Sequence, residues 1–341
     1  MSRRSKRKAV KIIKRIIAVI LIIVLIPVVI IGASAAVCTF LPGEKANADQ
    51  MTNPYITADK TLVSAHRSGG GIAPENTLMA FKNCIESENF NVDVFEFDLH
   101  ITKDGKLILL HDGTLDRTTN SAEAFGAEGV VPADKTYDEL MQLNFGENFR
   151  DENGNYPYRG LRGDDIPEDL HPLLLEDVLD YLKSNGDFRY IIEIKDAGEN
   201  GFKAADELYR ILKERDLVEK TVFGTFNGDV TEYVDNNHPD MLRSSGIKEV
   251  VLFYFAATLN IDLGDNFYKF EALQIPANQY KVIRLGTERI INYAHRHNIA
   301  VQYWTINDAD EVARLNSIGA DCIMSDVPDM AYKVVNGSEN V

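Results

Sequence analysis

Apolar runs and helical patterns alternate along most of the chain after residue 60. Short runs rich in Val, Ile, Leu and Phe predict strands at 62–66, 92–101, 107–111, 190–195, 221–226, 241–243, 272–275, 299–305 and 322–325. Apolar residues three and four positions apart predict helices between them, such as 75–88, 202–215, 287–297 and 309–318. Strand and helix in alternation predict a parallel sheet covered by helices.

These runs give one strand more than a (β/α)8 TIM barrel needs. Asp104-Gly105 between two runs is a hairpin-turn signal, so we predict an irregular barrel over 61–333 with a hairpin at its second strand. An open doubly wound sheet is the alternative, but no Gly-x-Gly-x-x-Gly follows the first strand. The polar stretch 113–172 fits neither period and is predicted to be an insertion that acts as a lid or selects substrate.

The region before the barrel has a different composition. Residues 1–15 contain eight Lys or Arg and no acid, and 16–37 contain no charged residue. A run of that length can cross the roughly 30 Å of a membrane as one helix. The basic flank then predicts a cytoplasmic tail and places the predicted barrel outside the cell membrane, joined to the membrane helix by a linker over 38–60. The alternative to a membrane helix is a cleaved signal peptide. At the other end of the chain, residues 334–341 are predicted to form a C-terminal tail.

The net charge of −16 hides an acidic body. Beyond Arg15 the chain has 28 basic residues against 52 acidic ones. Such a body repels phosphate backbones, so we expect no nucleic-acid partner. Three cysteines are too few for a disulfide framework, although a Cys84–Cys322 bridge stays open as an alternative to buried free thiols.

Two carboxylates alternate with apolar residues in one predicted strand. Because side chains of a strand alternate between its faces, Glu96, Asp98 and His100 share one face. If Asp104 and Gly105 are the two turn residues, Asp98 lies opposite His111. Oxygen-rich sites of this kind suit hard cations such as Ca²⁺ or Mg²⁺. The alternative is a half-exposed strand whose polar face meets water.

Two further segments carry candidate chemistry. Glu193 and Lys195 share a face of another strand. Glu193 is a candidate cation ligand and Lys195 a candidate phosphate contact. The alternative is that the two residues form only a salt bridge with each other. His66-Arg67 ends the first strand before three glycines, which let the backbone approach a ligand closely. The planar guanidinium of Arg67 suits phosphate oxygens. Trp304 ends a late strand, where it fills the core or forms a pocket wall.

Together these motifs resemble the glycerophosphodiester phosphodiesterase family. The resemblance rests on segments that occur in the family's order: His66-Arg67, Pro74-Glu75-Asn76-Thr77, Glu96-Phe97-Asp98, Thr102-Lys103-Asp104-Gly105, His111-Asp112, Glu193-Ile194-Lys195, Trp304-Thr305-Ile306-Asn307 and Ser325-Asp326-Val327-Pro328. It spans about 61–333. The chain departs from the family at Ser68, where Gly usually follows His-Arg.

The resemblance implies roles for these residues. Glu96, Asp98 and Glu193 would bind one divalent cation, Ca²⁺ or Mg²⁺. His66 and His111 would act as general base and acid, and Arg67, Lys195 and Trp304 would contact the substrate. The implied reaction is hydrolysis of glycerophosphodiesters, either glycerophospho-alcohols or a glycerol-phosphate polymer, to glycerol 3-phosphate and an alcohol. A lysophospholipase D, a cyclising lyase acting on lipids and a non-catalytic binding module are the alternatives.

Overall fold

A computed structural model describes residues 14–15, 26, 28–30, 32–47, 51–57, 60–264, 267–279 and 283–337. The predicted basic tail and membrane helix therefore lie mostly outside the described residues, as do the last four residues of the C-terminal tail. Within the described parts of the chain, we find no helix that is both long enough and apolar enough to cross a membrane.

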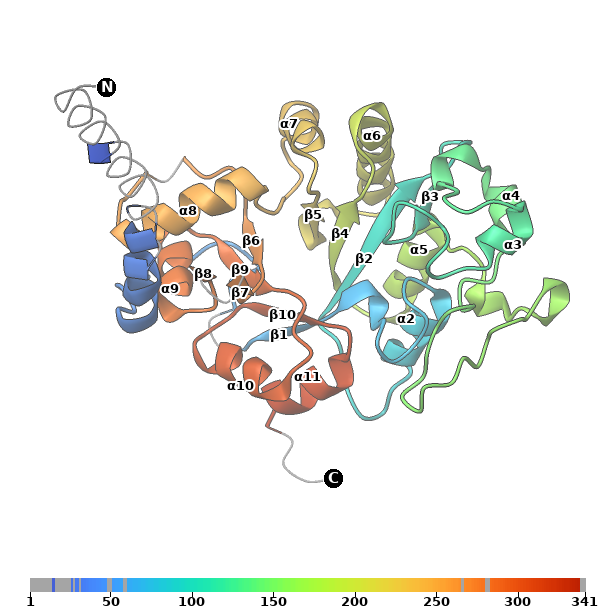
Figure 1. Ribbon diagram of the computed structural model, residues 1–341, viewed down its shortest axis with the longest axis horizontal. Coiled ribbons are helices and arrows are strands. Elements are labelled where there is room, and N and C mark those ends of the chain that lie inside the picture. The colour runs from blue at the N-terminus through green and yellow to red at the C-terminus, as the bar shows by residue number, and fades with distance from the viewer. Residues whose placement is uncertain are drawn as a thin grey trace, which may run out of the picture.

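Parallel strands form a barrel, as predicted (Figure 1). They are β1 (Leu62–Ala65), β2 (Val94–Ile101), β4 (Arg189–Ile194), β5 (Thr221–Gly224), β6 (Ala272–Ile275), β9 (Ala300–Tyr303) and β10 (Cys322–Ser325). Their order is β5-β4-β2-β1-β10-β9-β6. The predicted strand 241–243 is reduced to single parallel bridges, Arg243 with Phe223 of β5 and Ser244 with Ala272 of β6. These bridges close the barrel between β5 and β6.

The predicted hairpin is present, but its predicted register is wrong by one residue. Strand β3 (Leu107–Leu109) runs antiparallel to β2, with Leu99 opposite Leu109. Thr102 N–H donates to the Lys106 carbonyl at 2.8 Å, so the loop has three residues, and the last, Gly105, has φ 81°. Three-residue loops of this kind end in a left-handed residue, usually glycine. Asp98 O therefore accepts from Leu110 N–H, and His111 follows one position later.

Helices cover the outside of the barrel (Figure 1). They are α2 (Leu78–Ile85), α5 (Leu175–Asn185), α6 (Gly198–Glu214), α7 (Gly228–Asn237), α8 (Ile247–Leu259), α9 (Glu288–Arg296), α10 (Ala309–Ser317) and α11 (Pro328–Val335). Side-chain caps fix several starts: Thr77, Thr287 and Asp308 accept from backbone N–H groups of α2, α9 and α10. Helix α2 begins later than predicted because Asn76 has φ 57°, outside the helical region.

The insertion 113–172 packs beside β3, at the end of the molecule away from the N-terminal segment (Figure 1). It contains the short helices α3 (Ser121–Phe125) and α4 (Tyr137–Leu140). Leu115, Leu140 and Phe145 form a small core with Ile108 and Leu110 of the hairpin arm. The insertion thus shares a hydrophobic cluster with the hairpin arm, and this cluster holds the insertion to the barrel.

Residues 51–57 of the linker contact the end of the barrel that carries the amino ends of the strands. Tyr55 is buried, and the Asn53 side-chain amide donates to the carbonyls of Glu271 and Asn298 at 2.7 and 3.0 Å. Glu271 directly precedes β6 and Asn298 lies two residues before β9, so residues 51–57 lie at the amino ends of the strands, opposite the carboxyl ends that carry the predicted site.

Candidate active site

One cavity of about 120 Å³ collects side chains from the carboxyl ends of the strands. The lining residues that sequence reasoning had singled out are His66, Arg67, Glu96, His111, Glu193, Lys195 and Trp304. They come from five separate segments in sequence, and the barrel brings them together. Active sites of (β/α)8 barrels lie at this end of the strands, because the loops there converge on the barrel axis.

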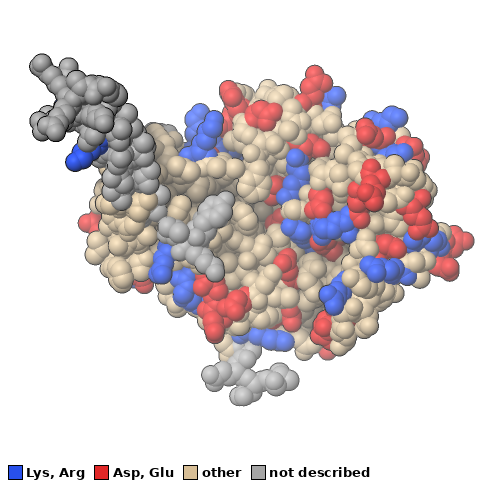
Figure 2. Space-filling model, viewed as in Figure 1, with Lys and Arg blue, Asp and Glu red and all other residues tan. Residues whose placement is uncertain are grey.

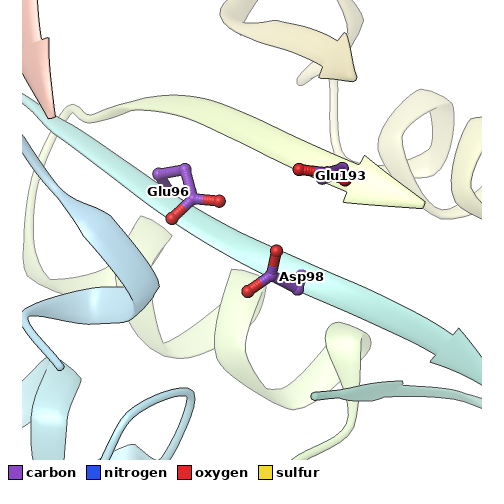
Figure 3. A group of neighbouring side chains, drawn as sticks. All are labelled: Glu96, Asp98 and Glu193. Carbon is purple, nitrogen blue, oxygen red and sulfur yellow. The ribbon is translucent and has the colours of Figure 1, made fainter. Parts of the chain in front are cut away.

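Three carboxylates meet beside this cavity (Figure 3). Glu96 and Asp98 project from β2 and Glu193 projects from the neighbouring β4, where Asp98 and Glu193 are register partners. One oxygen from each lies within 4.8 Å of the others. Apart from ion pairs with Lys195, Asp98 Oδ1 and Glu193 Oε1 have no hydrogen-bond partner among the described residues. Three buried oxygens that converge in this way fit a hard divalent cation.

Burial and the neighbouring charges shift the pKa values of these carboxylates. Burial and the neighbouring Asp98 raise the pKa of Glu96 above its ordinary value. Burial also raises the pKa of Glu193, against the opposing effect of Lys195. Burial acts in the same direction on Asp98, but Lys195 and His111 outweigh it, so the pKa of Asp98 is lowered. The site therefore has an electrostatic cost that a cation would relieve.

Lys195 lies among the acids. Its ammonium is 2.9 Å from Asp98 Oδ1 and 2.8 Å from Glu193 Oε1, and its side chain is 14% exposed. Burial lowers the pKa of Lys195, but Asp98 and Glu193 outweigh burial and raise it, so the ammonium stays charged. Because Lys195 also lines the cavity, the same positive charge is available to a bound anion.

His66 forms a dyad with an aspartate that follows β10. Its Nδ1 is 2.6 Å from Asp326 Oδ1, so the other ring nitrogen, Nε2, faces the site, 3.9 Å from Glu96 Oε2. Asn307 donates to the second oxygen of Asp326 at 2.6 Å and holds that carboxylate. Burial lowers the pKa of His66, but Glu96 and Asp326 outweigh it and raise the pKa above the ordinary value.

His111 forms a second dyad across the site. Its Nδ1 is 2.8 Å from Asp112 Oδ1. Burial lowers the pKa of His111, and the opposing effects of Asp98 and Asp112 do not restore it. Arg117 donates to Asp112 at 2.5 and 3.0 Å and also to Glu75 at 2.6 and 2.8 Å. The insertion thus supplies an arginine that fixes the aspartate behind His111.

Arg67 lies in a strained turn. It has φ 50°, its N–H donates to Glu96 Oε2 at 2.6 Å, and its guanidinium is 3.3 Å from Glu75. Ser68 follows with φ 63° and is fully buried. A left-handed conformation favours glycine, so a serine at position 68 has a conformational cost. Arg67 nevertheless lines the cavity.

Several neighbours of the site were not assigned roles from sequence. Asp326, Asp112, Asn307 and Asn76, which donates to Asp98 at 3.0 Å, all stand inside motifs that were recognised, so a signal was present. Arg117 had none, because its contacts depend on how the insertion folds. His100 shares the strand face but pairs with Asp196 at 2.9 Å and does not line the cavity.

The barrel, the acidic cluster and the two histidine dyads define a phosphodiesterase-like site, and comparison with known proteins identifies its family. Residues 66–330 match the model of the glycerophosphoryl diester phosphodiesterase family. The chain therefore belongs to this family and is a phosphoric diester hydrolase.

Individual relatives agree with this assignment. The glycerophosphodiester phosphodiesterase of Caldanaerobacter subterraneus is 27% identical over 280 residues, covering 81% of this chain and 98% of the relative. A glycerophosphoryl diester phosphodiesterase domain from Mycobacterium tuberculosis shares the fold with a TM-score of 0.64 at 17% identity, covering 81% of this chain and 99% of that one. A phosphodiesterase from Oleispira antarctica, solved with the product sn-glycerol-3-phosphate, has a TM-score of 0.58 at 19% identity, covering 81% and 97%.

Proposed function

We propose that the protein hydrolyses glycerophosphodiesters to glycerol 3-phosphate and an alcohol with the help of one divalent cation. The observation that carries this proposal is the convergence of Glu96, Asp98 and Glu193 beside two histidine–aspartate dyads in one cavity. Ca²⁺ and Mg²⁺ are both candidates, since carboxylate oxygens bind both.

The residues divide the electrostatic work. A phosphodiester is anionic, so attack on phosphorus requires positive charge near the oxygens on which further charge develops. A cation held by the three carboxylates would offset this charge and, by offsetting Glu96, would lower the pKa of His66. Arg67 and Lys195 line the same cavity and add fixed positive charge.

The histidines move the protons. Asp326 binds Nδ1 of His66, so the proton of the attacking hydroxyl would go to Nε2, which lies 3.4 Å from Thr305 Oγ1 and faces the site. His111, held by Asp112, donates a proton to the alkoxide that leaves. We propose that the hydroxyl on carbon 2 of glycerol attacks phosphorus and expels the alcohol, giving a cyclic phosphate. Water then opens the ring, so one water is consumed and glycerol 3-phosphate is released.

The assay is direct. Full-length protein in mild detergent is incubated with glycerophosphoethanolamine and with polyglycerol phosphate, and glycerol 3-phosphate is quantified with and without chelator. We expect release that chelator abolishes and that added Ca²⁺ or Mg²⁺ restores. Activity unaffected by chelator would remove the cation from the proposal, and an accumulating cyclic phosphate would identify a lyase instead.

We also propose that the catalytic domain works outside the cell membrane. Support comes from composition: eight basic residues precede the uncharged run 16–37. Protease added to intact cells should digest the barrel but spare an epitope tag placed before residue 1. Protection of the barrel would contradict this topology, and a tag lost from the mature chain would indicate signal-peptide cleavage.

A further inference from the structure

A second hollow of about 530 Å³ lies directly beside the catalytic cavity. Ile247, Val251 and Phe255 of α8 form one wall, and Ile275, Pro276 and Leu285 form the other. None of the described residues that line it is charged. We call this hollow the α8 groove.

The α8 groove and the catalytic cavity are continuous. Phe226, Ser245, Gln274 and Trp304 line both. The rings of Phe226 and Trp304 meet edge to face with centroids 6.0 Å apart, so the boundary is itself aromatic. A molecule whose phosphodiester lies between the histidines can therefore extend into the groove past this pair.

The groove exposes apolar surface that water solvates poorly. Ile247 is 61% exposed, Val251 53% and Phe255 37%, all on one helix. Contiguous apolar surface of this kind marks a binding site for an apolar ligand. The leaving alcohol of a soluble glycerophosphodiester is small and polar and would gain nothing from such walls. A hydrocarbon chain would be desolvated by them.

The position of α8 favours a lipid as the source of that chain. Cys38 Sγ lies 3.2 Å from Thr258 Oγ1 near the end of α8, and the Leu41 carbonyl accepts from Arg289 of α9, so the segment that follows the predicted membrane helix packs against these two helices. Figure 1 shows the N-terminal segment and α8 at the same end of the molecule. In Figure 2 charged residues are denser at the opposite end of the molecule than around α8, where Lys and Arg occur among tan residues and grey atoms cover part of the surface.

We propose that the α8 groove binds the single acyl chain of a lysoglycerophospholipid whose phosphodiester occupies the catalytic cavity. This assignment rests on the proposed function. A single chain follows from the proposed chemistry, because attack by the hydroxyl on carbon 2 requires that hydroxyl to be free, which leaves only carbon 1 for an acyl group. Products would be a lysophosphatidic acid and the same alcohol, with one water consumed.

The test compares substrates that share a leaving group. Ethanolamine release by full-length protein is measured with glycerophosphoethanolamine, with 1-acyl lysophosphatidylethanolamines from hexanoyl to decanoyl below their micellar concentrations, and with dihexanoyl phosphatidylethanolamine. We expect kcat/KM to rise about twofold to fourfold per added methylene until the groove is filled. The dihexanoyl lipid should not be cleaved.

Matched variants locate the effect. Val251→Asp places a carboxylate in the groove, whereas Leu252→Asp alters the next residue, which is 45% exposed but outside the groove. Val251→Asp should lower kcat/KM for the decanoyl substrate at least tenfold and leave that for glycerophosphoethanolamine unchanged, and Leu252→Asp should change neither.

Each other outcome has a defined meaning. Turnover of glycerophosphoethanolamine without any preference for acylated substrate overturns the groove assignment and leaves the proposed function intact. Equal losses in the two variants also overturn the assignment, because the effect would then be general to the face of α8. No turnover of any substrate overturns the proposed function itself.

Discussion

The ring of His66 contacts Asp326 through Nδ1 and faces Glu96 through Nε2. Both carboxylates raise the pKa of His66 against the effect of burial, but they act from opposite sides of the ring. Glu96 is a candidate cation ligand, so its charge changes when the site is loaded. Asp326 is not part of the acidic cluster, and its effect on His66 persists in both states.

Substitution of Asp326 should therefore shift a pH profile. Asp326→Asn removes a charge that raises the pKa of His66, so we expect the acid limb of kcat/KM to move to lower pH, with kcat also reduced because the ring is held less firmly. His66→Ala should lower kcat by about 10²- to 10⁴-fold. Initial rates from pH 5 to 9 measure the limb. Asp329→Asn, which alters a carboxylate paired only loosely with Lys333, serves as control, and an unmoved limb in Asp326→Asn would contradict the assignment.

Ser68 offers a stability test at the same turn. Its φ of 63° costs roughly 1–2 kcal/mol for an L-residue, and its buried hydroxyl has no hydrogen-bond partner in the part of the chain that the structure describes. Ser68→Gly relieves both but adds flexibility to the unfolded chain, at a cost of roughly 0.4–1 kcal/mol. We expect a net gain of about 1–2 kcal/mol in urea unfolding. Asp216→Gly, at an exposed residue with φ 58°, isolates the backbone effect, and a destabilised Ser68→Gly protein would contradict this account.

The sequence predicted the facing of side chains in the hairpin of β2 and β3 but not the register between the two strands. Alternation along β2 correctly placed Glu96 and Asp98 together, because a strand has a fixed period. The predicted register was wrong by one residue, because the length of the loop decides the register. Asp104-Gly105 fits a two-residue loop and also the last two positions of a three-residue loop, which is the loop that forms. His111 still reaches the site because it follows the strand and is oriented by Asp112.

Other parts of the site could not be predicted because they depend on long-range packing. The strand ends that carry His66, Glu193 and Trp304 were correctly located by apolar runs and motifs. The Arg117 contacts with Asp112 and Glu75 join residues whose proximity is set by the core of the insertion. The composition of 113–172 indicated an insertion, but of its described residues none lines the catalytic cavity, so the lid role stays a prediction.

The insertion should act on catalysis through Arg117. Burial raises the pKa of Asp112, but hydrogen bonds from Arg117 and His111 outweigh it and bring the pKa to about 2. Arg117→Met removes the first of these bonds and the link to Glu75, so we expect kcat to fall about tenfold or more while KM changes little. Steady-state kinetics measure this. Arg159→Met, which alters an exposed arginine elsewhere in the insertion, is the control, and equal losses in both variants would indicate a general effect on folding.

At the scale of the whole molecule, the acidic cluster links folding to pH and to cation binding. The pKa of Glu96 rises from 4.5 to about 7 because of burial and Asp98. A carboxyl with a raised pKa binds its proton more tightly in the folded protein than in the unfolded chain. The stability of the cation-free protein should therefore fall as pH rises through this interval, because the folded state must lose a proton that it favours.

A bound cation should remove that dependence. Binding to the folded state alone adds about 3 kcal/mol when the free cation is roughly 100 times its Kd. We expect chelated protein to lose stability between pH 4.5 and about 7, and Ca²⁺ or Mg²⁺ to raise the Tm most at the upper end. Scanning calorimetry of the full-length protein measures both. Glu96→Gln, which cannot ionise, should flatten the profile of the chelated protein and weaken the stabilisation by cation. If the chelated Glu96→Gln protein kept the wild-type slope, ionisation of Glu96 would not be what links stability to pH, and this account of Glu96 would be contradicted.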